Sequence, residues 1–479
     1  MDSTRTRTEA NEAVDDPDRL ARLFLAKRYT HRKGGPTLIY WRQDWLRWDG
    51  AGYYETFADE LRAAIHAEVK AEFDRHNQLA LEQWAAKAKP DDAKKPTAIK
   101  VTRGTITNVV DALQKIVILD STVEPPAFIG ACRFRMHNLI AMQNGVLDLG
   151  IYFAGRPNCL RESSPKYFTQ VSLPYSYIPG ARCPTWLDVL SHNLEGDAQR
   201  IAIAQEWAGL NLVPDTSFHK FFVGEGDGAN GKSAYCAGLM AMVGQRNCSH
   251  VPLEIFGERF ALWPTIGKLA NIAAECSEAD RIAEAVLKSF VSGDTLQIDR
   301  KNKTILNNAA TARLTFMANN RPRFHDRSSG LWRRMILMPF RVTIGDEERI
   351  DGMDKPEWWR AKGELEGMFL WALEGLKRLR RHRRFTRSDV CEEAAAGYRL
   401  ESNPACQFLD DKCEADPEGK VVSATLYDGY QRWAKANGYS PLSAGKFGGE
   451  VKRAFPKMRR GQEERIWHYF GVRFNQFGD

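Results

Sequence analysis

The chain lacks the cysteine pattern of a zinc-binding or disulfide-stabilised protein. Its nine cysteines are scattered over 479 residues, and no two of them form a C-x-x-C pair. The missing spacing excludes the usual zinc ribbon, and an odd number of cysteines offers no complete disulfide framework. A reducing compartment is therefore expected, and the predicted location is the cytoplasm.

The chain also lacks a membrane-directing segment and a strong excess of one charge. The first residues, 1–5, are polar, and no apolar run is long enough to cross a bilayer. Charged residues make up 27% of the chain, hydrophobic residues 43%, and the formal net charge is +7. This composition indicates an ordinary soluble protein, and so modest a charge permits contact with nucleic acid without arguing for it.

The most informative stretch that is present is the octet 226–233, which fits the pattern G-x-x-x-x-G-K-[ST]. It follows an apolar run at 221–223 and precedes a stretch typical of a helix, which is the context that a P-loop requires. Backbone N–H groups of such a loop converge on phosphates, and the helix dipole adds to the attraction. The octet predicts a site for ATP and Mg²⁺ in which Lys232 reaches the β- and γ-phosphates and Ser233 binds the metal. The nucleotide-binding residues are expected to be Gly226, Gly228, Asn230, Gly231, Lys232 and Ser233.

Two later apolar runs, each predicted to form a strand, are followed directly by a polar residue. The run 269–274 leads to Glu275, and the run 313–318 leads to Asn319. A carboxylate at a strand tip beside a P-loop can hold Mg²⁺ or polarise the attacking water, and an amide can position that water. The alternatives are a surface carboxylate at 275 and a simple Asn–Asn turn before a proline.

Two adjacent arginines, Arg333 and Arg334, follow Trp332 and precede another apolar run. Arginine keeps its charge and offers a forked set of donors, so it suits a γ-phosphate sensor supplied by a neighbouring subunit. Solvated arginines are the alternative.

Between these strands, the segment 293–306 has two β-rich arms around a basic turn. It predicts a protruding hairpin whose tip carries Arg300, Lys301 and Lys303. Basic side chains on such a hairpin can follow DNA phosphates without reading sequence. A charged, exposed turn is an equally good interpretation.

Local patterns predict several elements along the chain: hairpins at 45–54 and around 144–149, helices at 55–88 and 104–118, a loop at 87–96, and a single Trp-rich helix from Trp358 to the basic run 377–384. The expected organisation is a disordered lead (1–18), a mixed α/β region of unknown role (19–125), a helical domain (126–212), an ATPase core (213–345), a helical linker with a basic end (346–384) and a winged-helix-like domain of helices followed by a strand pair (385–479).

Taken together, these motifs resemble those of superfamily-3 helicases, in particular the phage and plasmid primase–helicase group related to the poxvirus-type helicase-primase. In that group the P-loop commonly reads G-x-G-x-N-G-K-S, as 226–233 does here. The acid-tipped strand matches at Glu275, the sensor asparagine at Asn319, and the W-R-R element at 332–334, where Arg334 fits the finger position better than Arg333. The resemblance covers roughly residues 125–479. A second acid beside Glu275 is doubtful, because Cys276 follows it and the next acid is Glu278.

The resemblance implies an α/β fold with an AAA+-like P-loop core and an ATP-dependent helicase that acts on single-stranded and forked DNA in the replication of a phage, plasmid or mobile element. It implies a ring, expected to be a hexamer, in which Arg334 of one subunit completes the site of Lys232, Ser233 and Glu275 in another. If a mobile element encodes the chain, the compartment is the cytoplasm of a bacterial host. No constellation of paired carboxylates with a histidine is evident before residue 125, so no primase activity is expected, and a separate primase or replication protein is a candidate partner.

A second function stays open at this point. A DNA-binding initiator or defence ATPase could use hydrolysis to switch assembly without processive unwinding. In either case the basic residues Lys446, Lys452 and Arg453 could contact duplex DNA from a winged helix, although an amphipathic helix with outward basic residues explains them equally well. A small-molecule kinase would use the same loop, but it explains neither the basic hairpin nor the W-R-R element.

Overall fold

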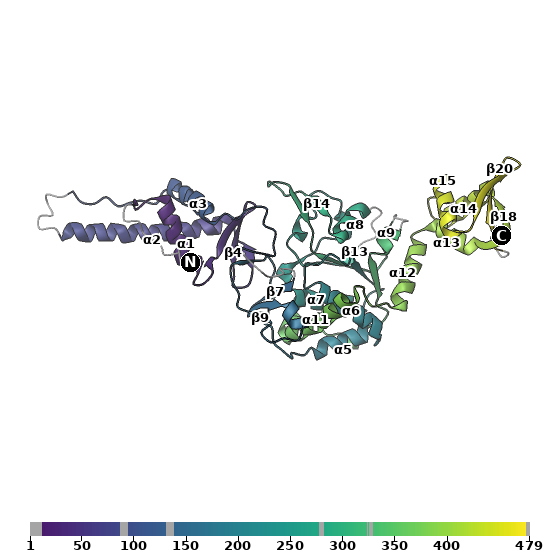
Figure 1. Ribbon diagram of the computed structural model, residues 1–479, viewed down its shortest axis with the longest axis horizontal. Coiled ribbons are helices and arrows are strands. Elements are labelled where there is room, and N and C mark those ends of the chain that lie inside the picture. The colour runs from purple at the N-terminus through teal and green to yellow at the C-terminus, as the bar shows by residue number, and fades with distance from the viewer. Residues whose placement is uncertain are drawn as a thin grey trace.

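The computed structural model describes residues 12–86, 94–130, 138–276, 282–322, 324 and 329–475. Figure 1 shows an elongated molecule, with the helix α2 (Ala58–Ala85) at one end, an α/β centre, and a C-terminal unit at the other end. Most of the predicted disordered lead, residues 1–11, lies outside the described residues. Helix α1 (Pro17–Arg28) already begins within its last part, where the Asp16 side chain accepts a hydrogen bond from the Arg19 backbone N–H.

The N-terminal region combines three helices with a small antiparallel sheet. Helices α1, α2 and α3 (Arg103–Val117) share a buried cluster that includes Phe24, Ile65 and Leu113. The two helices predicted at 55–88 and 104–118 are therefore confirmed, whereas residues 87–93 of the predicted loop lie outside the described residues. The sheet orders β3 (Leu38–Trp41), β4 (Asp44–Trp48) and β5 (Tyr53–Glu55), which confirms the hairpin predicted at 45–54.

A second small sheet and three helices precede the central sheet. Strands β7 (Leu139–Met142) and β8 (Gly145–Asp148) form the predicted second hairpin, and β9 (Leu160–Arg161) pairs with β8. Helices α4 (Leu149–Phe153), α5 (Pro184–Asn193) and α6 (Ala198–Leu210) follow. Short strand pairs connect these parts: β1 (Thr30–His31) with β2 (Gly35–Pro36), and β6 (Ala127–Phe128) with β10 (Tyr167–Phe168).

The central sheet has five parallel strands, which confirms the predicted α/β class. Their order across the sheet is β12 (Cys248–Ser249), β13 (Ala270–Cys276), β16 (Arg313–Ala318), β11 (Phe221–Glu225) and β17 (Met335–Pro339). All residues of β16 and β17 are buried, as expected for parallel strands that are covered on both faces. Because the strands are parallel, all their carboxyl ends lie at one edge of the sheet, where α/β proteins bind ligands.

Helices cover both faces of this sheet (Figure 1). On one face, α6, α7 (Lys232–Val243) and α11 (Leu365–His382) share a large apolar cluster that includes Trp186 and Trp207. Gly209 of α6 lets α11 approach, since a Cβ there would lie 2.3 Å from the Ala372 carbonyl oxygen. On the other face lie α8 (Glu284–Ser292), α9 (Ser329–Trp332) and the hairpin of β14 (Thr295–Ile298) and β15 (Leu306–Ala309).

The prediction of a single Trp-rich helix is wrong, because two helices occupy that stretch. Helix α10 (Pro356–Lys362) ends at Gly363, and α11 starts two residues later. Gly363 has φ +73°, a left-handed conformation that ends a helix at little cost for glycine.

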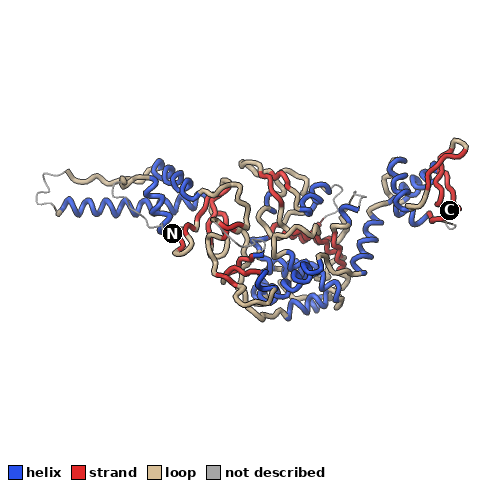
Figure 2. Tube along the Cα trace, viewed as in Figure 1, coloured by secondary structure: helices blue, strands red, loops and turns tan. Residues whose placement is uncertain are grey.

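The C-terminal unit follows α12 (Asp389–Glu401), which packs on the edge strand β17. It contains α13 (Pro404–Lys412), β18 (Cys413–Val422), α14 (Ser423–Ala436), α15 (Ala444–Ala454), β19 (Arg459–Glu463) and β20 (Ile466–Phe474) (Figure 2). The expected strand pair is incomplete, because β18 inserts between α13 and α14 and the sheet runs β18–β20–β19. Within the described part of the chain, no helix has both the length and the apolar character required to cross a membrane.

Candidate nucleotide-binding site

The predicted P-loop lies between β11 and α7, in the strand–loop–helix arrangement that the octet requires. Gly228 and Gly231 have φ values of +103° and +82°, which are left-handed conformations that favour glycine. A Cβ at Gly231 would lie 2.1 Å from Nδ2 of Asn193, so a side chain has no room there. The first N–H groups of α7 have no intrahelical partner, and they point into the loop that precedes the helix.

Lys232 is held beneath this loop in a defined position. Its ammonium group donates to the Gly226 carbonyl at 2.6 Å and to Oδ1 of Asn230 at 3.0 Å. The residue is only 6% exposed, and burial lowers the pKa of the ammonium, a shift that the nearby Asp227 charge opposes. Both hydrogen-bond acceptors are neutral, so the charge of Lys232 is not cancelled by them. A buried cation under a ring of backbone N–H groups is suited to bind the oxygens of a phosphate chain.

Asn230 fixes the shape of the loop from inside. It is 3% exposed, and its Nδ2 donates to the Phe340 carbonyl at 3.3 Å, beyond the end of β17. The Ile344 backbone N–H donates to the Ala229 carbonyl at 2.7 Å, which joins the loop to the segment after β17. Ser233 is exposed in the first turn of α7.

The two polar strand ends reach the same edge of the sheet as the P-loop. Glu225 is opposite Ala318, and Ala318 is opposite Cys276, so the last residues of β11, β16 and β13 are level. Asn319 is exposed directly after β16 and lines a cavity of about 650 Å³ together with Gly226, Gly228 and Asn230. Glu275 belongs to β13, but its side chain, like Glu278, lies outside the described residues.

Arg333 and Arg334 lie at the amino ends of the strands, opposite the carboxyl ends where the P-loop lies. The Arg334 carbonyl accepts from the N–H of Phe221, the first residue of β11, whereas the P-loop follows the last residue of that strand. The Arg334 guanidinium donates to Oγ of Ser292 at 2.8 Å and to the Gly330 carbonyl at 2.7 Å. Arg333 is exposed, and its carbonyl accepts from Nζ of Lys220 at 2.6 Å. Five strand residues span about 16 Å, so neither arginine reaches the P-loop of its own subunit.

Sequence reasoning missed Arg321, which lines the same cavity as the P-loop. Its guanidinium forms a two-point ion pair with Glu225 at 2.7 and 3.0 Å and a second pair with Glu401 of α12 at 2.8 Å. The hydrogen bond with Glu225 is the main cause that raises the pKa of Arg321. Its position two residues after Asn319 was the only local signal, because both carboxylates are remote in sequence.

The hairpin predicted at 293–306 is confirmed, since β14 and β15 pair from Thr295 to Ala309. The expectation that Arg300 is exposed at its tip is wrong. Arg300 is 7% exposed, donates to Asp44 at 3.1 Å and to the Arg42 carbonyl at 3.1 Å, and lies over the ring of Trp263. Lys303 also forms an ion pair with Asp44. Lys301 is exposed.

The predicted DNA-contacting residues of the C-terminal unit lie on α15. Lys446 and Lys452 are exposed, and Arg453 donates to the buried Glu450 at 2.6 Å. Two further arginines on β19 lie over aromatic rings of β20: Arg459 over Phe470 at 4.7 Å and Arg460 over Trp467 at 4.8 Å. The basic surface therefore extends from α15 to the β19–β20 hairpin.

Of the two residues that would hold Mg²⁺, Ser233 has a described side chain and Glu275 has a described backbone. Ser233, exposed in the first turn of α7, offers a hydroxyl oxygen of the kind that magnesium binds, and Glu275 is the second-last residue of β13. Among the described residues, no group of three or more His, Cys, Asp or Glu side chains forms a separate metal cluster. The donors therefore suit a metal that is bound mainly by nucleotide phosphates and water.

Three family models match the chain. One, described as D5 N terminal like, matches residues 22–192, and another, described as Poxvirus D5 protein-like, matches residues 400–475. The chain is therefore similar to poxvirus D5-like proteins over residues 22–192 and 400–475. The family consists of helicase–primase proteins of replication, and the N-terminal match begins about 100 residues earlier than the sequence motifs suggested. The third, a family of unknown function (DUF5906), matches residues 225–334, which run from the end of β11 to Arg334.

Solved structures of the NrS-1 C-terminal region are also similar to this D5-like chain. An apo structure, "The A form apo structure of NrS-1 C terminal region-CTR", shares 11% identity and covers 96% of this chain and 100% of its own, with a TM-score of 0.47. An apo structure of residues 305–718 shares 12% identity and covers 97% of this chain and 100% of its own, with a TM-score of 0.44. At TM-scores below 0.5, these similarities carry no conclusion about the site.

Proposed function

We propose that this D5-like protein is an ATP-dependent DNA helicase that assembles into a ring, expected to be a hexamer, and translocates on single-stranded DNA during replication of a phage, plasmid or mobile element. One observation carries the proposal: the P-loop lies at the carboxyl ends of the parallel strands, and Arg334 lies at their amino ends. A complete ATPase site then requires the P-loop edge of one subunit to face the arginine edge of the next. Repeated head-to-tail contacts of this kind close into rings.

The chemistry follows from the residues at the two edges. Backbone N–H groups of 226–231 and the Lys232 ammonium would bind the β- and γ-phosphates, and Asn319 would orient the attacking water. Glu275 would polarise that water and, with Ser233, would help to hold Mg²⁺, which neutralises phosphate charge when bound. Arg334 of a neighbour would stabilise charge that develops on the γ-phosphoryl group. The strand order, in which one strand separates β11 from β13, supports an AAA+-like core.

Two surfaces are candidates for DNA contact. The turn of the β14–β15 hairpin carries the exposed Lys301, and it also carries Arg300 and Lys303, which pair with Asp44. The C-terminal unit has three helices and a β-hairpin, which supports the winged-helix interpretation, and it exposes Lys446 and Lys452 on α15. Lysines with free ammonium groups contact phosphates without base specificity, as a translocating motor requires.

Strand displacement tests the proposal. Purified protein with ATP and Mg²⁺ should unwind a forked DNA, and Lys232→Ala should abolish both unwinding and ATP hydrolysis. Lys377→Ala serves as a control, because Lys377 is exposed on α11 and contributes to neither edge of the site. Transfer of the γ-phosphoryl group of ATP to a small acceptor instead of water would refute a DNA motor.

The alternative, a DNA-binding initiator or defence ATPase, draws on the Arg321 ion pairs. They join Glu225, directly before the P-loop, to Glu401 at the end of α12, which leads into the C-terminal unit. Such a connection could transmit nucleotide state to a DNA-binding unit without unwinding. Hydrolysis stimulated by single-stranded DNA, in the absence of any strand displacement, would favour this alternative.

A further inference from the structure

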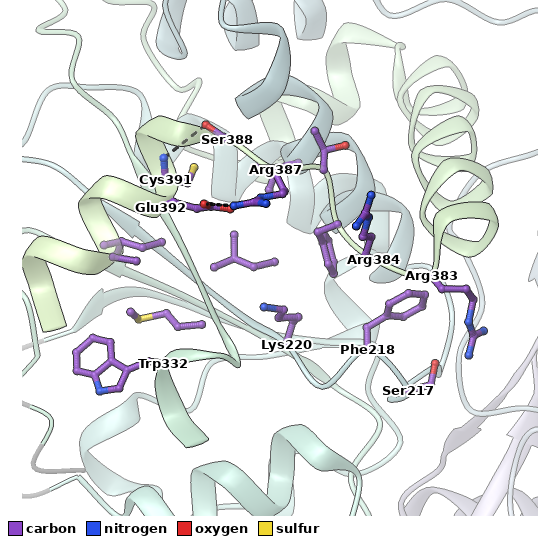
Figure 3. Close-up of a pocket in the computed structure, with 17 residues that line it drawn as sticks. Ser217, Phe218, Lys220, Trp332, Arg383, Arg384, Arg387, Ser388, Cys391 and Glu392 are labelled. Atoms are coloured by element: carbon purple, nitrogen blue, oxygen red, sulfur yellow. Dashed lines mark hydrogen bonds and ion pairs between the residues drawn. The ribbon is translucent and has the colours of Figure 1, made fainter. Parts of the chain in front are cut away.

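A second cavity, of about 560 Å³, lies beside the first half of β17 (Figure 3). The segment between α11 and α12 forms one wall, and the strand forms the floor. Apolar groups line its interior, and they include Ile203, Phe218, Met335, Leu337 and Ala395. The cavity is therefore suited to an apolar side chain rather than to a nucleotide.

Cations surround this apolar interior. Arg383, Arg384, Arg387 and Lys220 all line the cavity, whereas Glu392 is the only carboxylate among the described lining residues. Arg387 is neutralised by a two-point pair with Glu392 at 2.7 and 2.8 Å, which Figure 3 shows as dashed lines. Arg383 and Arg384 are exposed and form no ion pair with any described residue. An occupant of this cavity would thus need an apolar group flanked by negative charge.

One segment of the chain has that chemistry. Residues 346–351 contain Asp346, Glu347, Glu348 and Asp351 against a single base, Arg349. They are exposed throughout, and Ile350 between the acids is itself 53% exposed. The segment departs from the P-loop, where the Ile344 N–H donates to the Ala229 carbonyl.

Within one subunit, no residue of 346–351 lines the described wall of the cavity. The cavity lies beside the first residues of β17, and the acidic segment leaves from beyond its last residue. The cavity and Ile344, from which the acidic segment departs, therefore lie at opposite ends of β17, about 16 Å of strand apart, like Arg334 and the P-loop. A head-to-tail neighbour would bring them together at the same contact that joins the finger to the P-loop.

We infer that the cavity beside β17 is the docking site for the acidic segment 346–351 of a second copy of this chain. Ile350 enters the apolar interior, and Glu347 faces Arg384 at the rim. The inference rests on the proposed ring and adds to it the contact that holds one subunit against the next. Complementary charge at the rim fixes the register, and the buried isoleucine supplies the apolar contact.

Charge reversal tests this pairing. Sedimentation velocity with a non-hydrolysable ATP analogue and a single-stranded oligonucleotide gives the protomer concentration at half-assembly. Arg384→Glu and Glu347→Lys should each raise that concentration about tenfold, and Ile350→Asp should raise it further. The double variant Arg384→Glu/Glu347→Lys should return to within about threefold of the unmodified protein. Lys377→Glu and Asp354→Lys are matched controls, because both positions are exposed and neither belongs to the cavity or the segment.

The outcomes separate the inference from the proposed function. If the unmodified protein forms rings and the reversals assemble equally well, the docking inference is wrong and the helicase proposal stands. Loss of assembly in both single variants without recovery in the double variant also overturns the pairing. A chain that stays monomeric with nucleotide and DNA would overturn the ring and the docking site together.

Discussion

Asp44 and Arg300 form a largely buried ion pair that joins the β14–β15 hairpin to the N-terminal sheet. Arg300 Nη1 lies 3.1 Å from Oδ2 of Asp44, and the two side chains are 5% and 13% exposed. Asp44 also pairs with Lys303, so one carboxylate occupies two of the three basic groups that were expected to follow DNA. By pairing with Arg300 and Lys303, the N-terminal sheet reduces the positive charge that the hairpin can offer to DNA.

Asp44→Asn should increase the affinity for single-stranded DNA. The substitution removes the competing carboxylate, so Lys303 and, after local opening, Arg300 become available to phosphates. Each added phosphate contact steepens the dependence of log K on log salt by about 0.7 for a single strand. Fluorescence anisotropy over a salt series measures this slope. Asp59→Asn, an exposed position on α2, is the control, and an unchanged slope for Asp44→Asn would show that neither Lys303 nor Arg300 gains a phosphate contact.

The contrast between P-loop and hairpin shows what the sequence can predict. The P-loop is a contiguous octet, and its glycines and lysine act through backbone geometry that is local to the chain. The pairs of Arg300 with Asp44 and of Arg321 with Glu401 join residues far apart in sequence, and no periodicity marks such partners. The break at Gly363 was missed for a different reason, because apolar and basic residues continue a helical pattern on both sides of the glycine. The sheet order likewise depends on long-range pairing, although the resemblance to superfamily-3 helicases correctly implied the α/β class.

Mixed subunits should recover ATP hydrolysis that neither parent possesses. Arg334→Ala subunits retain Glu275, and Glu275→Ala subunits retain Arg334, so a site with both groups forms wherever they adjoin in the right order. Random mixing in equal amounts restores about a quarter of the sites in a head-to-tail ring. Steady-state ATPase assays over a range of mixing ratios measure the recovery. No recovery in mixtures that still assemble would contradict a site shared between subunits.

Arg321→Lys should lower ATP hydrolysis even though it keeps the charge. A lysine cannot form the two-point pair with Glu225 while also contacting Glu401, because it lacks the planar fork of the guanidinium. The pair is partly buried, so its loss should also lower the free energy of unfolding by about 1–2 kcal/mol. Glu401→Gln is the comparison, since Glu401 is 60% exposed and its loss leaves the Glu225 pair intact. Equal hydrolysis by Arg321→Lys and the unmodified protein would exclude a role at the P-loop edge.

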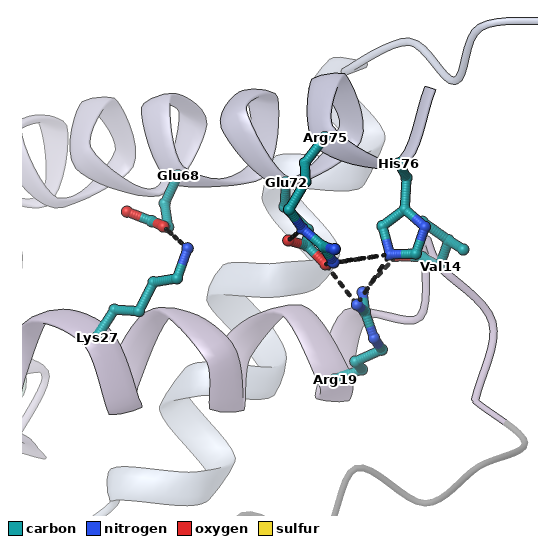
Figure 4. Close-up of polar contacts among 7 residues, drawn as sticks. All are labelled: Val14, Arg19, Lys27, Glu68, Glu72, Arg75 and His76. Carbon is teal, nitrogen blue, oxygen red and sulfur yellow. Dashed lines mark hydrogen bonds and ion pairs between the residues drawn. The ribbon is translucent and has the colours of Figure 1, made fainter. Parts of the chain in front are cut away.

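The N-terminal helices should lose stability in acid because of Glu72. Its carboxylate on α2 is 3% exposed and accepts from Arg19 of α1 and from Arg75 (Figure 4). Burial alone would raise its pKa, but the hydrogen bonds from the two arginines outweigh it and lower the pKa to about 2. A lowered pKa in the folded state means that this stability is present above the unfolded value, near 4.5, and is lost as the pH falls toward 2.

Chemical denaturation between pH 6 and pH 3 measures this dependence. The unmodified protein should lose about 2 kcal/mol over this range, because Glu72 takes up a proton in the unfolded state while it stays ionised in the folded state. Glu72→Gln should already lack that contribution at neutral pH. Glu68→Gln is the matched control on the same helix, where the partners Lys27 and Arg28 are about half exposed and the contribution is smaller. Parallel pH profiles for Glu72→Gln and the unmodified protein would contradict the assignment.

Two substitutions at Asn230 distinguish a positioning role from simple filling of space. Its Oδ1 accepts from Lys232, and its Nδ2 donates to the Phe340 carbonyl. Asn230→Ala should weaken ATP binding about tenfold, because the lysine and the loop each lose one hydrogen bond of ~1 kcal/mol or slightly less. Asn230→Asp has nearly the same shape but places a carboxylate against Lys232, so it should weaken ATP binding further by neutralising the cation and repelling phosphate. Isothermal titration calorimetry gives both affinities, with Asn437→Ala as an exposed control. If Asn230→Asp binds ATP as tightly as Asn230→Ala, the amide does not act through the charge of Lys232.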